Sequence, residues 1–142
     1  MNDPASGPFV GLAVLCQHVE RKPDGSMDVL GIVEGVLLDP PGASAADPLE
    51  LRPVAVLPLR LVVSLRAGDC LGWHEVGVAG RYPAGNVGPS TGVRVEFSAD
   101  RPTATINVPV ELEVHEPGSY RFDISLGGRL LTTVPLRVVF SE

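Results

Sequence analysis

The sequence predicts an all-β fold, an antiparallel β-sandwich of about eight strands with immunoglobulin-like or related Greek-key topology. Short runs of alternating apolar and polar residues recur along the chain, as in strands with one buried face. The 14 prolines and 16 glycines cluster between these runs and predict turns. No run shows the spacing of an amphipathic helix. A closed barrel is the alternative architecture.

The length and composition are those of one folded domain. A chain of 142 residues is long enough to bury its own core. We expect residues 1–8 to form a flexible tail and residues 9–142 to form a single β-sandwich domain. Because 44% of residues are hydrophobic but only 5% are aromatic, the core must consist mainly of Val and Leu.

The N-terminal part predicts a hairpin. Residues 9–20 are apolar on both faces until Gln17, which indicates a strand covered on both sides or one that bears a bulge. The Lys-Pro-Asp-Gly sequence of residues 22–25 is a strong turn signal. Residues 27–38 then return antiparallel, and their Gly31 and Gly35 indicate a bend or a close approach of another backbone.

The middle of the chain alternates between loops and strands. Residues 39–53 are rich in Pro, Ala and Asp, and we interpret them as a loop that crosses between the two sheets. Residues 54–66 form a strand in which Pro58 predicts an edge or a bulge. Residues 73–82 form the next strand, and residues 83–91 are predicted to be a loop before a short strand that ends near Phe97.

The last third, from residue 106 to residue 140, alternates most clearly. Two turn signals, at residues 116–118 and at Gly127-Gly128, divide it into a predicted three-strand meander. Tyr120 falls on the face that points to the core. A buried hydroxyl needs a hydrogen-bond partner there, as in a tyrosine corner.

Charge and hydropathy exclude several classes of partner. The net charge is −6 and the 11 basic residues are scattered, so we expect no binding to nucleic acid or to an anionic membrane surface. No stretch approaches the roughly 20 apolar residues of a membrane span. The apolar run of residues 9–16 follows no basic residue, which argues against a secretion leader. Two cysteines indicate no disulfide framework, so we expect a cytoplasmic protein.

No pattern in the sequence indicates an enzyme. Phosphate-binding loops, nucleophile elbows and His-Glu-x-x-His motifs are absent from the sequence. Two Cys/His pairs, Cys16 with His18 and Cys70 with His74, contain zinc-type ligands but lack the tight spacing of a zinc knuckle. We therefore predict no catalytic residues, no metal and no cofactor.

Binding features are somewhat clearer. Trp73, His74 and Arg81 are candidate contacts for a partner or a ligand, because an exposed Trp can anchor a protein or stack on a sugar ring. The interpretation that we favour for Trp73 is nevertheless structural: it plugs an end of the sandwich or packs under a loop.

Surplus apolar residues point to a second covered surface. Residues 9–16 and 29–38 are apolar on both faces, and Val54, Val56 and Val62 lie opposite the core-facing residues of their strand. The long loop or a second subunit could cover them. We therefore predict a non-enzymatic protein-interaction or scaffold module that can form a homo-oligomer. The alternative is a small-ligand or carbohydrate-binding β-sandwich that uses Trp73 and adjacent loops.

The order of short motifs resembles a family of small uncharacterised bacterial β-sandwich proteins that are known as domains of unknown function. The matching segments are Leu15-Cys16, Asp24-Gly25, Leu30-Gly31-Ile32-Val33, Pro117-Gly118-Ser119-Tyr120-Arg121-Phe122 and Pro135-Leu136-Arg137-Val138. Gln17 replaces the acid that usually follows the cysteine in this family. The resemblance implies a fold and a bacterial origin, and it implies no activity.

Overall fold

The computed structural model describes residues 7–39 and 54–141, which contain nine strands and no helix. The strands are β1 (Phe9–Arg21), β2 (Met27–Ile32), β3 (Gly35–Leu38), β4 (Ala55–Arg66), β5 (Gly72–Arg81), β6 (Val87–Phe97), β7 (Thr103–Val114), β8 (Gly118–Leu126) and β9 (Arg129–Phe140). The count exceeds the expected eight because the predicted strand of residues 27–38 is divided into β2 and β3 at the bend that its glycines indicate.

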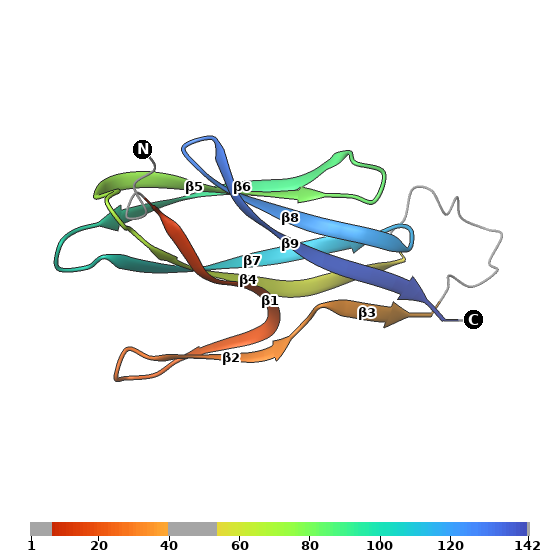
Figure 1. Cartoon of the computed structure of the whole chain (residues 1–142). Helices are drawn as coiled ribbons and strands as arrows, with labels where there is room; N and C mark the ends of the chain where they lie inside the picture. The colour runs from red at the N-terminus through yellow and green to blue at the C-terminus, as the bar shows by residue number, and fades with distance from the viewer. Residues whose placement is uncertain (1–6, 40–53, 142) are drawn as a thin grey trace.

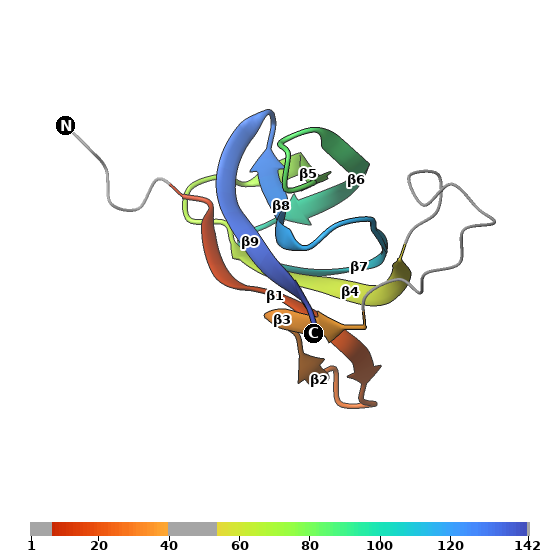
Figure 2. The same cartoon turned by 90° about the vertical axis from the view of Figure 1, so that its right-hand side faces the viewer.

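The strands form the predicted β-sandwich. One sheet, called sheet A below, has the order β2-β1-β4-β7, and the other, sheet B, has the order β3-β9-β8-β5-β6 (Figures 1 and 2). All neighbours are antiparallel except β3 and β9, which run parallel. The chain changes sheets between β2 and β3. The expected crossing loop of residues 39–53 lies, apart from Asp39, outside the described residues.

The two sheets share one apolar core, and most of its residues are Val and Leu, as the composition predicts. Its largest fully buried side chains include Tyr120, Phe97, Phe122, Leu15, Leu61, Leu65, Leu112, Ile124 and Leu136. Of the expected tail, only residues 7 and 8 are described. Pro8 is buried, and the Gly7 carbonyl accepts hydrogen bonds from Cys70 Sγ (3.2 Å) and Arg129 Nη2 (3.5 Å).

The predicted three-strand meander is wrong in one connection. β8 and β9 form the expected hairpin, but β7 belongs to the opposite sheet, so residues 115–117 cross the sandwich. Tyr120 stands at this crossing and is fully buried. Its hydroxyl donates to the Glu116 carbonyl (2.7 Å), as expected for a tyrosine corner. The ring meets Tyr82 edge-on, with the ring centroids 5.8 Å apart.

Three prolines within strands lie where no described strand could accept a hydrogen bond from the backbone nitrogen. Pro58 of β4 faces the side of β1, and the pairing of β1 with β4 stops at the register pair Cys16–Arg60, before it reaches Pro58. Pro109 lies on β7, the outer strand of sheet A, and Pro89 lies on β6, the outer strand of sheet B. Proline cannot donate a ladder hydrogen bond. The end of the β1–β4 pairing before Pro58 therefore confirms the predicted edge.

The β1–β2 hairpin extends beyond the sandwich. β1 contains a register shift between Val10 and Leu12, which is the bulge that its sequence suggested. After Cys16 it pairs, among the described strands, with β2 alone (Figures 1 and 2). The predicted turn closes the hairpin: Gly25, at φ 90°, donates to the Lys22 carbonyl, and Asp24 Oδ1 accepts from the amide and hydroxyl of Ser26.

Strand β6 begins earlier than the sequence predicts. Residues 83–91 were expected to be a loop, but only residues 82–86 turn, and β6 starts at Val87. Residues 87–92 include Gly88, Pro89 and Gly92 and have no apolar alternation, so they do not resemble a strand. They are paired because the β5 backbone offers them a ladder.

Candidate functional site

The three predicted contact residues do not form one site. Trp73 and Arg81 lie at opposite ends of β5 on the outer face of sheet B, whereas His74 points inward and packs against Phe97. Trp73 is 59% exposed, so the interpretation as a plug or a residue under a loop is wrong. The Arg94 guanidinium stacks on the indole at 4.9 Å and covers part of it.

The outer face of sheet B exposes Leu37 and Val139 side by side at its β3–β9 edge, but it is polar and internally paired at its centre. Asp123 is its centre: the carboxylate lies 3.3 Å from Arg81 Nε and 3.6 Å from Arg121 Nε, and it accepts a hydrogen bond from the Thr133 hydroxyl at 3.0 Å. Between this cluster and Trp73 the sheet presents the small residues Gly77, Gly92, Ser90 and Ser125. The centre of this face is therefore suited to contact with water.

The outer face of sheet A is apolar instead. Leu12 is 41% exposed, Leu30 45%, Val56 49% and Ile32 54%. The register places them on one face, because Ile32 lies opposite Cys16, Cys16 lies opposite Arg60, and alternate residues of β1 and β4 share that side. We call these four residues the sheet A patch. Leu12 belongs to the segment of residues 9–16, and Leu30 and Ile32 belong to the segment of residues 29–38, both of which the sequence marked as apolar on both faces.

Two residues beside the patch are already covered. Cys16 and Val62 point to the same outer face, yet they are 0% and 1% exposed. The Arg60 guanidinium donates to Asn107 Oδ1 (3.4 Å). Asn107 is the register partner of Val62, so the Arg60 side chain extends diagonally toward the neighbour of Val62. Burial raises the pKa of the Cys16 thiol, and the backbone at His18 and the Arg60 charge offset part of this rise.

The two cysteines lie in different surroundings. Cys16 belongs to the outer face of sheet A, whereas Cys70 Sγ donates to the Gly7 carbonyl and the Cys70 carbonyl lies 3.1 Å from His74 Nε2. Within residues 7–39 and 54–141, no three His, Cys, Asp or Glu side chains come close enough together to hold a metal ion. The same residues contain no helix that is long and apolar enough to span a membrane.

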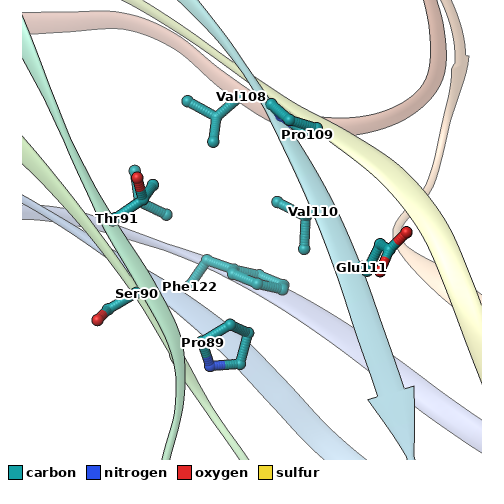
Figure 3. A pocket seen from close by; sticks show the side chains of 9 residues that line it. Pro89, Ser90, Thr91, Val108, Pro109, Val110, Glu111 and Phe122 are labelled. Atoms are coloured by element: carbon teal, nitrogen blue, oxygen red, sulfur yellow. The ribbon is translucent and has the colours of Figure 1, made fainter.

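A groove opens where the two outer strands β6 and β7 separate. The turn at residues 98–102 joins them, and they diverge from it (Figure 1). Figure 3 shows Pro89 and Thr91 of β6 on one side, Val108 and Val110 of β7 on the other, and the Phe122 ring between them. The cavity holds about 130 Å³.

A larger cleft lies on the opposite side of the sandwich, where the chain passes from β2 to β3. It holds about 400 Å³ and lies against Leu15, Val33, Glu34 and Arg137. Backbone hydrogen bonds from Val33 to Leu15 (2.8 Å) and from Arg137 to Glu34 (3.1 Å) cross it. These bonds tie β1 to β9 through the sheet-changing segment, so the cleft follows from the fold.

Sequence reasoning missed the groove because it assigned Pro89 and Thr91 to a loop. A signal was present. Residues 82–86 repeat the Pro-x-Gly turn of residues 22–26, with the same two backbone hydrogen bonds, from Tyr82 to Asn86 and from Gly85 to Tyr82. A tight turn of this kind implies a strand directly after it.

Comparisons with known proteins show no family and return only distantly similar structures. No family model and no curated protein matches the sequence. The chain is similar in structure to an immunoglobulin-like protein from Pseudomonas aeruginosa, with 15% identity, a TM-score of 0.45, and coverage of 96% of this chain and 100% of that one. It is also similar to the CARDB domain of a Pyrococcus furiosus protein solved with di-metal ions, with 12% identity, a TM-score of 0.43, and coverage of 98% and 99%.

A third similar structure is the alkylpurine DNA glycosylase AlkC from Pseudomonas fluorescens, bound to DNA. Identity is 13%, the TM-score is 0.44, and 89% of this chain covers 30% of that one. At such identities the likeness concerns the β-sandwich architecture alone. The class that the strand order itself defines is a two-sheet β-sandwich.

Proposed function

We propose that the protein is a non-enzymatic interaction module that self-associates through the sheet A patch. The observation that supports this is the exposure of four large apolar side chains on the outer face of sheet A, three of them on the neighbouring strands β1 and β2. Single exposed apolar residues are ordinary on protein surfaces, whereas neighbouring ones mark a contact surface. Leu30 and Ile32 are such neighbours, two residues apart on the same side of β2. A homo-oligomer with two-fold symmetry would place the patch against its own copy.

The hairpin supplies part of this surface. Leu30 and Ile32 lie on β2, the outer strand of sheet A, and Leu12 and Val56 lie on the neighbouring strands. Burying a Leu, Ile or Val side chain contributes about 1.5–3 kcal/mol in favourable cases. Several such residues on each protomer are enough to sustain association, because together they offset the translational and rotational entropy that is lost when two protomers associate.

Sedimentation velocity over a range of protein concentrations tests the proposal. We expect an oligomer that Ile32→Lys converts into a monomer, since a charge would be buried in an apolar contact. The matched control is Ser119→Lys, which places the same charge on an exposed position of sheet B. A wild-type protein that stays monomeric at every concentration would contradict self-association.

A second candidate function rests on the exposed indole of Trp73. One face of the ring is stacked by Arg94, and a ring with remaining exposed area suits a small ligand or a sugar. Binding on a glycan array that Trp73→Ala abolishes would support this candidate. The cytoplasmic location, expected from the two cysteines, remains a prediction alongside both candidates. The bacterial origin, which the family resemblance implies, also remains a prediction.

A further inference from the structure

Two strand edges border the groove, one of β6 and one of β7, and no described strand pairs with either. The two edges are not equivalent. β7 pairs with β4 in an unbroken register from Thr103 to Val114. β6 contains a register shift opposite Ala79 and Arg81 and carries Gly88, Pro89 and Gly92. A regular, long and exposed edge is the better template for a further strand. The free side of β7 is therefore the stronger binding surface.

The backbone groups that β7 presents outward can be identified. The Val114 carbonyl accepts from Val54, so the even-numbered residues of β7 face β4. The odd-numbered residues then direct their amides and carbonyls to the free edge. They include Asn107, Glu111 and Glu113, and Pro109 offers a carbonyl without a donor. An added strand has ladder partners on both sides of Pro109.

The cavity fixes the chemistry of one side chain of such a strand. Its walls are mainly apolar, with Val108 and Val110 from β7, Phe122 from β8 and Pro89 from β6 (Figure 3). Ser90, Thr91 and Glu111 are its polar lining residues. An apolar cavity of about 150 Å³ can take one benzene ring. A volume of about 130 Å³ therefore accepts one branched aliphatic side chain that points inward from an added strand.

The charges on β7 determine which side chains the added strand should carry at its outward positions. Glu111 and Glu113 are exposed on the outer face of β7, next to its free edge. Glu111 forms no ion pair with another described residue, and the Glu113 carboxylate lies 3.8 Å from His115 Nε2. Opposite charges directly across a pair of strands attract, and like charges repel. Outward positions of the added strand should therefore carry Lys or Arg.

We infer that the free edge of β7 binds an extended segment of a partner protein in which apolar and basic residues alternate. The segment extends sheet A by one strand, an apolar side chain fills the groove, and basic side chains face Glu111 and Glu113. This mode of recognition combines main-chain hydrogen bonds with one specificity pocket. The inference extends the proposed role as an interaction module and uses the free edge of β7, which two strands separate from β2 with its Leu30 and Ile32. Val56 of the sheet A patch lies opposite Glu113, so variants of Ile32 and of Thr91, which are not part of that pair, test the two proposals separately.

A synthetic peptide in which Val and Lys alternate, with a fluorescent label, is the probe. We expect saturable binding to the full-length protein in fluorescence anisotropy, weaker at high salt. Glu111→Lys with Glu113→Lys should weaken it about tenfold or more, since two favourable pairs become unfavourable. The same variant should gain binding to a peptide in which Val and Glu alternate. Glu96→Lys, on the far face of sheet B, is the matched control and should change affinity by less than about twofold.

Two further measurements separate strand addition from simple charge attraction. Thr91→Leu places a larger side chain in the groove and should abolish binding, while Ser119→Leu, which adds more bulk but outside the groove, should not. A Val/Lys peptide with alternate amides methylated should also fail to bind, because it cannot form the ladder. Equal binding of the methylated peptide, no effect of Thr91→Leu, or no binding of the Val/Lys peptide at all would overturn the inference. Sedimentation of the same variants reports separately on self-association.

Discussion

The sheet A patch and the centre of the outer face of sheet B, over β5 and β8, are built from different side chains. Both sheets cover the same core and expose their other face. The centre of sheet B exposes glycine, serine and an Asp123 that is paired to two arginines and a threonine, and its exposed apolar residues, such as Trp73, Leu37 and Val139, lie toward its margins. Sheet A exposes the four apolar residues of its patch. Both sheets pack on the same core, so the stability of the core cannot explain why their outer faces expose different side chains.

The contrast separates what holds the fold from what remains for binding. The polar side chains of sheet B pair with one another and need no outside partner. The sheet A patch leaves apolar area in water at a cost of about 25 cal/mol per Å². Association would remove this cost. Substitutions on the two faces should therefore affect different measurements, with stability responding on one side and oligomeric state on the other.

The largest expected effect compares the two faces of one strand in sheet A. Leu61 is fully buried on the inner face of β4, and Val56 is half exposed on its outer face. Leu61→Ala should lower the free energy of unfolding by about 2–5 kcal/mol, because it leaves a cavity. Val56→Ala should change it by about 0.5 kcal/mol or less. Urea denaturation of dilute protein measures both, and similar losses would show that the patch supports the fold.

Tyr120→Phe should have the next largest effect. The hydroxyl is buried and donates to the Glu116 carbonyl at 2.7 Å, so its removal should cost about 1 kcal/mol. Binding and oligomeric state should not change, because the ring still fills the core. Urea denaturation gives the first quantity and sedimentation the second. A variant as stable as the wild type would refute the structural role of the tyrosine corner.

The same residue predicts a dependence on alkaline pH. Burial raises the pKa of Tyr120 in the folded protein above its ordinary value of about 10. Above the ordinary value the unfolded chain loses the proton while the folded one keeps it, so stability falls as pH rises toward the raised pKa. The decrease should be smaller in Tyr120→Phe. Unfolding curves over an alkaline pH series measure it, and parallel pH profiles of the two proteins would contradict the assignment.

Local alternation predicted which residues face the core but not which sheet each strand joins. Tyr120 and Leu112 alternate with polar neighbours in the same way, and both face the core, yet they come from opposite sheets. A strand on either side of a sandwich has the same pattern, because each buries one face. The turn at residues 116–118 therefore resembled a hairpin although the chain crosses the sandwich there.

The candidate sites were harder to predict for a related reason. Parity correctly placed Trp73 opposite the core, but its exposure depends on whether a distant segment covers it. The groove residue Thr91 is exposed and points inward beside Phe122, in a stretch with no apolar alternation. Surfaces that bind partners are not buried in the isolated chain. The alternation that marks core strands is therefore weakest where binding is proposed.

The smallest expected effect concerns the charged cluster of sheet B. Asp123→Asn removes the ion pairs with Arg81 and Arg121, which lie directly opposite each other in the β5–β8 register. The Asp123 side chain is only 18% exposed, but the arginines are partly solvated, so we expect a loss of about 0.5–1 kcal/mol. The loss should shrink at high salt, because salt screens solvated charges. Urea denaturation at low and high salt measures it, with Thr133→Val as the control that removes the hydrogen bond but no charge. A loss that salt leaves unchanged would mean that packing, and not charge, holds the outer face of sheet B.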